Sequence, residues 1–266
     1  MRALLVAALL VLAGCGTAGP APTDTATAAP VPDSGSYPPG VDGDGVVSAV
    51  ALGNAHAEAT AGSYRVRSNW TVRHANGTLR GRVVQRATVT PAAWTTTLVV
   101  TGDTGIVADG NATAVFYSEG EALVQRVRRP NRTTYLYVPP AEYNGGSGFY
   151  NSLRRPKPYR DPGVLADAVA LRLAERAPNG SVVLAGDSLA DASLFELSVG
   201  VAEPRNVSYR LRVTASGLVR TQRLAYTGTV RGETVVVTRT VRYLPYDGTV
   251  ERPPWYDTAR NESVRG

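Results

Sequence analysis

The chain has 266 residues and a net charge of +6, with 28 lysines and arginines against 22 aspartates and glutamates. Its single cysteine excludes intramolecular disulfide bonds, so apolar burial and strand pairing must hold any folded domain together. No glycine-rich phosphate loop is present, which argues against nucleotide use.

Residues 1–14 have the pattern of a prokaryotic lipoprotein signal peptide. Arg2 is followed by a small and apolar run from Ala3 to Ala13, and Gly14 precedes Cys15. The run is shorter than the roughly 20 residues that span a bilayer. We therefore expect cleavage before Cys15, lipidation of Cys15, and anchoring on the extracytoplasmic face of the cell membrane.

The remaining chain divides by composition. Residues 15–36 are rich in Thr, Ala and Pro without periodicity, which predicts a disordered tether that follows the lipidated cysteine. Residues 37–260 are long enough for one domain with a sizeable core, and we expect 261–266 to be a short tail.

Within that domain, most of the pattern has a period of two. A helix is expected over 46–61, capped by Asp44 and ended by Gly62, and a second helix begins at Pro162 with an apolar stripe that reaches Leu173. The segment 182–189 is interpreted as a connection. Strands are expected at 64–73, 79–90, 94–101, 106–108, 114–118, 122–128, 133–138, 194–201, 207–214, 219–229 and 234–244.

These elements predict an α+β fold that is mainly β: a curved antiparallel sheet, or half-barrel, wrapped over two helices. Its concave face is expected to be apolar. The residues expected to line that face are Tyr64, Val66, Trp70, Val72, Tyr209, Leu211 and Val213, which alternate with arginines and other polar residues.

Seven of the ten asparagines lie in Asn-x-Ser/Thr sequons, more than a Thr-rich chain produces by chance. With a prokaryotic lipoprotein signal, this pattern favours a glycosylated archaeal envelope protein. The candidate glycosylation sites are Asn69, Asn76, Asn111, Asn131, Asn179, Asn206 and Asn261.

Arginine supplies almost all of the positive charge, since Lys157 is the only lysine. Clusters of this kind either are solvated strand faces or contact anionic headgroups or glycans. A protein outside the cell gives no reason to expect nucleic acid. The clusters are Arg126, Arg128, Arg129 and Arg132, and then Arg154, Arg155, Lys157 and Arg160.

The motifs that could carry chemistry are incomplete. The segment Gly186-Asp187-Ser188-Leu189 resembles the first block of the GDSL esterases, but no histidine follows it that could serve as the base. His56 and His74 lie upstream and are expected at the surface. Asp42 and Asp44 resemble a calcium loop without its distal glutamate, which favours a solvated turn. We expect no metal, no cofactor and no enzymatic activity.

The order of segments resembles a family of haloarchaeal lipoproteins. The likeness rests on the lipoprotein signal, the tether, residues 37–41 (YPPGV), the helix with His56, the strands, and residues 250–256 (VERPPWY). More remotely, the plan is similar to that of the LolA/LppX-like carriers, in which a half-barrel sheet holds lipid acyl chains. That second resemblance implies a lipid-binding cavity on the concave face.

Two hypotheses follow. The protein is either a membrane-anchored lipoprotein that binds a lipid or other amphipathic ligand, or a glycosylated structural protein of the envelope. In the second case it would bind an envelope protein or an anionic glycan and no small molecule. An apolar cavity in the sheet distinguishes the two.

Overall fold

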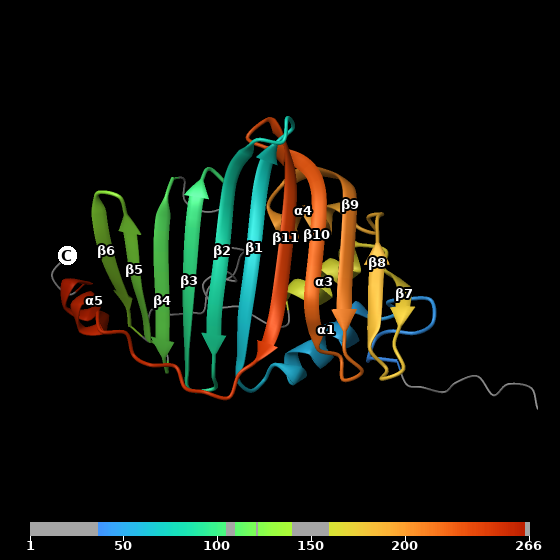
Figure 1. Ribbon diagram of the computed structural model, residues 1–266, viewed down its shortest axis with the longest axis horizontal. Coiled ribbons are helices and arrows are strands. Elements are labelled where there is room, and N and C mark those ends of the chain that lie inside the picture. The colour runs from blue at the N-terminus through green and yellow to red at the C-terminus, as the bar shows by residue number, and fades with distance from the viewer. Residues whose placement is uncertain (1–36, 105–109, 121, 140–159, 264–266) are drawn as a thin grey trace, which may run out of the picture. The chain divides into compact units, whose positions relative to one another are not determined.

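The computed structural model describes residues 37–104, 110–120, 122–139 and 160–263, all within the compact unit Gly35–Gly266. These residues form one curved, open antiparallel sheet of 11 strands with four helices (Figure 1). The expected mainly β fold and curved antiparallel sheet are confirmed. None of the described helices is long and apolar enough to cross a membrane.

The sheet joins two meanders. From edge to edge the strands lie in the order β6-β5-β4-β3-β2-β1-β11-β10-β9-β8-β7, so that the first and last long strands of the sequence pair at its centre. The strands are β1 (Tyr64–His74), β2 (Leu79–Val89), β3 (Ala93–Gly102), β4 (Ala112–Glu119), β5 (Ala122–Arg129), β6 (Arg132–Val138), β7 (Arg172–Arg176), β8 (Val182–Gly186), β9 (Ala202–Val213), β10 (Val219–Val230) and β11 (Glu233–Pro245).

The two faces of the sheet differ in kind. We call the face that carries α1 (Ala49–Ala59), α3 (Arg160–Ala168) and α4 (Ala192–Val199) the inner face, and the opposite one the outer face (Figure 1). Inner-face residues are buried in one continuous core, while their neighbours along each strand are mostly exposed. This follows from the period-two alternation of the pleated strand.

Helix α1 begins later than its sequence pattern predicted. Ser48 is its N-cap and accepts a hydrogen bond from the Ala51 amide, whereas the side chain of Asp42 closes a turn with the amides of Asp44 and Gly45. The prediction of Asp44 as the cap was therefore wrong. Thr60, and not Gly62, ends the helix by donating its hydroxyl to the carbonyl of His56.

His56 is fully buried, which corrects the expectation of a surface residue. Its Nδ1 accepts a hydrogen bond from the Val219 amide at 3.2 Å, and its ring meets that of Tyr243 edge-on at 4.5 Å. Gly217 (φ +86°) brings the β9–β10 turn against Ala55 of α1, where a Cβ would stand 2.4 Å from the alanine methyl. These contacts seat α1 on the inner face.

The strand expected at 194–201 is wrong, because α4 occupies Ala192–Val199. Asp191 caps the helix by accepting from the Leu194 amide at 2.9 Å, and that hydrogen bond lowers the pKa of its carboxyl. Gly200 ends it in the left-handed conformation (φ 69°). The short apolar run was assigned to a strand because its length does not distinguish the two.

Two further corrections lie between α3 and α4. The second helix ends at Ala168, so Leu173 belongs to β7 and not to a helical stripe. The expected connection at 182–189 contains the buried strand β8, which pairs with β9 in the sheet. The strand expected at 106–108 lies outside the described residues.

A fourth helix, α5 (Tyr256–Ser263), packs on the outer face of β5 and β6. Trp255 and Ala259 are buried there against Tyr117 and Val124. Burial, followed by the hydrogen bond to Glu119, raises the pKa of Tyr117 to about 12. The C-terminal segment therefore closes a second, smaller core.

Arg252 fastens the chain before α5. It donates to Glu119 through Nε at 3.1 Å and through Nη2 at 2.8 Å. That paired hydrogen bond is the main reason that the pKa of Glu119 is lowered, and the Tyr117 hydroxyl adds to it. The result is a polar clamp at the edge of the smaller core.

Candidate functional site

The four β1 residues that were predicted to line the ligand site lie on the inner face, at the centre of the sheet. Tyr64, Val66, Trp70 and Val72 all point to this face and are nearly or fully buried. Across the strand pair they stand opposite Val89, Ala87, Val83 and Gly81 of β2. The apolar surface therefore continues from β1 toward β6.

The β9 residues lie three strands away, on the side of the sheet that α4 covers. Tyr209, Leu211 and Val213 are buried in the core that includes the helices. The Tyr209 hydroxyl donates to Gln222 Oε1 at 3.0 Å. The neighbouring Tyr226 meets Phe195 of α4 edge-on at 5.3 Å, and burial raises the pKa of Tyr226. This part of the inner face holds the helices in place.

The other half of the inner face has a different character. Helices α1, α3 and α4 lie behind the half of the sheet that runs from β1 to β7, and none of them lies behind β3 or β4 (Figure 1). Its residues are nonetheless buried, and they are mainly large and apolar: Trp94, Leu98, Phe116 and Leu123.

Polar side chains interrupt this apolar surface, and three of them lie close together on β3, β4 and β5. Thr96 on β3, Phe116 on β4 and Gln125 on β5 form one cross-strand row, while Ser118 lies in the next row between Trp94 and Leu123. Thr96 Oγ1, Ser118 Oγ and Gln125 Oε1 are buried and have no hydrogen-bond partner among the described residues. Directly opposed and diagonal positions in adjacent strands lie roughly 5–8 Å apart, so one molecule can reach all three.

Such atoms are costly, since each buried polar group left unsatisfied costs about 1–3 kcal/mol. A few polar groups on a surface of aromatic and aliphatic side chains is the composition that binding sites for amphipathic ligands have. These residues were not predicted as site residues, because only the apolar members of the alternating pattern were taken as lining. The available signal was a polar residue at the apolar phase of each strand.

The arginines of the first sequence cluster do not share one environment. Arg126 lies over the ring of Trp255 at 5.1 Å and belongs to the smaller core, whereas Arg128, Arg129 and Arg132 are exposed. Of the second cluster, Arg154, Arg155 and Lys157 lie outside the described residues, as does Cys15.

Six of the seven sequon asparagines are exposed. They occupy turns between strands, the start of β9 and helix α5: Asn76, Asn111, Asn131, Asn179, Asn206 and Asn261. Asn69 differs, because it lies half-buried in the middle of β1 on the outer face and accepts a hydrogen bond from Arg82 Nε at 2.6 Å.

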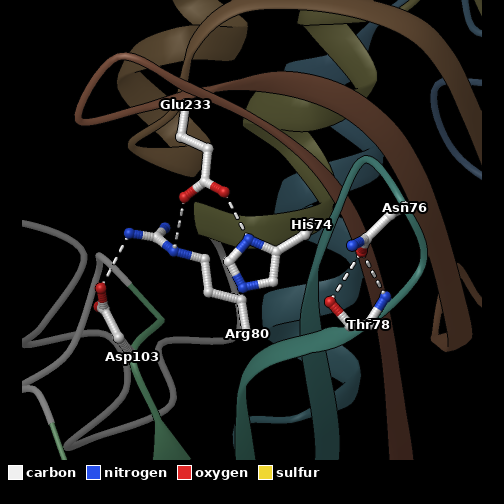
Figure 2. A network of polar contacts seen from close by, with 6 residues as sticks. All are labelled: His74, Asn76, Thr78, Arg80, Asp103 and Glu233. Carbon is white, nitrogen blue, oxygen red and sulfur yellow. Dashed lines mark hydrogen bonds and ion pairs between the residues drawn. The ribbon is translucent and has the colours of Figure 1, made fainter.

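A polar network joins the loops at one end of the sheet, as Figure 2 shows. His74 and Arg80 both contact Glu233, and Arg80 also donates to Asp103 at 2.8 Å. The β1–β2 hairpin is thereby linked to the β10–β11 hairpin and to the end of β3. We interpret this network as structural.

The described part of the chain contains no group of three or more His, Cys, Asp or Glu side chains that could hold a metal ion. Ser188 is exposed just after β8. His56 and His74 are each engaged elsewhere, in the helix core and in the network of Figure 2. Neither histidine therefore stands ready as a base for the serine of the GDSL-like segment.

Comparison with solved structures finds proteins that are loosely similar to this chain. It is similar to LprF from Mycobacterium bovis at 16% identity and a TM-score of 0.42, over 77% of this chain and 95% of that one. A putative outer membrane lipoprotein-sorting protein domain from Vibrio parahaemolyticus matches at 10% identity and a TM-score of 0.29, over 77% of this chain and 96% of that one. A DUF1329 family protein from Desulfovibrio piger matches at 9% identity and a TM-score of 0.28, over 77% of this chain and 95% of that one.

No protein-family model matches the chain, and no curated protein does either. The resemblance to haloarchaeal lipoproteins therefore stays a prediction. All three TM-scores lie below 0.5, so the likeness is loose.

Proposed function

We propose that this protein binds an amphipathic, lipid-class molecule against the inner face of β1 to β5. The observation that carries the proposal is the set of buried, unpartnered polar atoms of Thr96, Ser118 and Gln125 within an apolar surface. A ligand with an apolar body and a polar head satisfies both parts of that surface.

The polar atoms narrow the ligand class. Gln125 Oε1 only accepts hydrogen bonds, whereas the hydroxyls of Thr96 and Ser118 both donate and accept. A head group that consists of a fully ionised phosphate has no donor for Gln125. The ligand head must therefore carry a hydroxyl or amine hydrogen, as a glycerol, a sugar or an amino head group does.

The apolar body would lie along Trp94, Leu98, Phe116 and Leu123. Tyr64, Val66, Trp70 and Val72 of β1 would extend this wall toward the centre of the sheet. The proposal leaves Tyr209, Leu211 and Val213 to the core beneath α4.

The sequence of the first 36 residues indicates where in the cell this binding takes place. We propose that Cys15 carries a lipid anchor and that the tether holds the domain on the extracytoplasmic side of the membrane. In that position the protein has direct access to membrane lipids.

The test is native mass spectrometry of the full chain purified from its host, followed by solvent extraction and identification of any bound lipid. We expect a bound molecule in the wild type, and a reduced fraction in the Thr96→Val, Ser118→Ala double variant. Thr101→Val, on the exposed outer face of β3, is the matched control and should retain it.

A chain that stays empty after incubation with host lipid extract contradicts the proposal. That result would favour the alternative, a structural or interaction protein of the envelope. Retention of lipid by the double variant at the wild-type level would equally remove these two residues from the site.

A further inference from the structure

The outer face of β1, β2, β9, β10 and β11 carries exposed arginines that the strand pairing brings together from distant parts of the sequence. We define the arginine platform as seven exposed residues on these five neighbouring strands: Arg67, Arg86, Arg210, Arg212, Arg220, Arg223 and Arg242.

The strand register forces these like charges together. Arg67 stands directly opposite Arg86 on one side and Arg242 on the other, and Arg223 stands opposite Arg210. Directly opposed like charges destabilise a strand pair. A sheet that keeps several such pairs is therefore poised for an external anion that relieves the repulsion.

The platform has almost no internal counter-charge. In the described residues, the one ion pair of the platform joins Arg210 Nη2 to Glu175 Oε1 at 2.6 Å. The guanidinium groups of the other six have no hydrogen bond or ion pair with any described residue. They are available for bidentate contacts with phosphate oxygens.

The surface is both broad and slightly hollowed. The row from β2 to β9 covers four strand spacings, or about 19 Å. Over β8 to β11 the arginines line a depression of about 420 Å³, with Val183, Leu244 and Pro245 beside them. A single linear anionic polymer would contact only part of this two-dimensional array and leave the other arginines without an anion.

Exposed aliphatic side chains share this face. Leu244 is 36% exposed opposite Arg65, and Val236 is 37% exposed opposite Arg73. Basic residues mixed with exposed aliphatic ones suit the headgroup region of a bilayer, where guanidinium groups meet phosphates and short apolar side chains enter the interface. A soluble anionic glycan has no use for them.

We propose that the arginine platform docks on the phosphate groups of an anionic phospholipid surface, so that the outer face of the sheet lies against the membrane. This docking is independent of the ligand proposed for the inner face. It would fix the orientation of the domain, and the inner face would then be turned away from the bilayer surface.

The experiment uses the full chain with Cys15→Ala, so that lipidation at that position is absent from every sample. Binding to sedimented vesicles is measured for neutral phosphatidylcholine and for phosphatidylcholine with 30% phosphatidylglycerol. The apolar N-terminal run is the same in all variants, and the neutral vesicles measure its contribution.

The platform variant is Arg67→Gln, Arg223→Gln, Arg242→Gln. The matched control is Arg129→Gln, Arg132→Gln, Arg260→Gln, which removes the same charge from exposed positions at the other end of the sheet and on α5. We expect the platform variant to lose on the order of 10²-fold in affinity for anionic vesicles, since each arginine near such a surface contributes about a five-fold factor. The control should lose much less.

Two further readouts separate docking from folding and from other anions. The platform variant should be as stable to urea as the wild type or more so, because like charges are removed. Wild-type binding should fall as salt increases. Equal binding to both vesicle types, or equal loss in both variants, overturns the proposal. Binding to dextran sulfate without binding to anionic vesicles also overturns it, in favour of a glycan.

Asn69 supplies an independent check, because its sequon lies within the outer face between Val84 of β2 and Thr240 of β11. A glycan on Asn69 would stand in the plane of docking. Peptide mass spectrometry should therefore find Asn69 unmodified, and full glycan occupancy at this position would overturn the proposal.

Discussion

The hydroxyl of Thr96 gives the sharpest test of the inner-face site, because stability and ligand affinity should change in opposite directions. Thr96 is 0% exposed, and within the described parts of the chain its Oγ1 has no hydrogen-bond partner. Thr96→Val replaces the hydroxyl by a methyl group of nearly the same size. In the ligand-free protein this should remove an unsatisfied polar group worth about 1–3 kcal/mol.

The free energy of unfolding of ligand-free Thr96→Val should therefore rise by about 1–2 kcal/mol. For a unit of this size each kcal/mol corresponds to about 2–4 °C in Tm. Affinity for the extracted lipid should fall about three- to ten-fold, since one neutral hydrogen bond is lost from the complex. The measurements are calorimetric unfolding of delipidated protein and a lipid-binding titration.

Thr101→Val is the control on the same strand, because its side chain is exposed on the outer face. It should change stability by no more than about 0.5 kcal/mol. A loss of stability in ligand-free Thr96→Val would show that the hydroxyl is satisfied, and the reasoning for a polar-headed ligand would fail. A gain in stability with unchanged lipid affinity would place the head group elsewhere.

Three further predictions concern the framework. The pKa of Glu119 is held below its usual value near 4.5, so the clamp between Glu119 and Arg252 stabilises the α5 core above that pH and is lost as the pH falls below about 4.5. Trp255 fluorescence should follow this loss, and the Glu119→Gln variant should not show it. His56→Ala should cost about 3–5 kcal/mol in urea unfolding, because it opens a cavity under α1 and leaves a buried amide of β10 unpaired. Asp103→Ala should cost about 1–2 kcal/mol by the same assay, because Arg80 is nearly buried and retains only its longer contact to a partly exposed carboxylate.

The strands could be read from the sequence because their alternation is a local property. Side chains of a β-strand point to opposite faces in turn, so Tyr64, Val66 and their neighbours revealed the buried face without any knowledge of pairing. Helix α4 was mistaken for a strand because an eight-residue apolar segment fits either structure, and its caps at Asp191 and Gly200 decide the matter.

The character of each residue's surroundings was set by tertiary structure. His56 could not be placed in the core until β10 was seen to present an amide to it. Thr96, Ser118 and Gln125 each interrupt the apolar phase of their own strand, but they become a cluster only because β3, β4 and β5 pair in this register.

By itself, the sequence determined an antiparallel, mainly β fold with an apolar face and an arginine-rich face, because both depend on the short-range period of two. It also predicts the signal and lipid anchor at Cys15. The tertiary structure alone decided which strands meet: β1 pairs with β11, and Arg67 thereby comes to face Arg242 across about 175 residues of chain. Pairing over such separations depends on the whole sheet closing in one register, and no local pattern encodes which distant strands become neighbours.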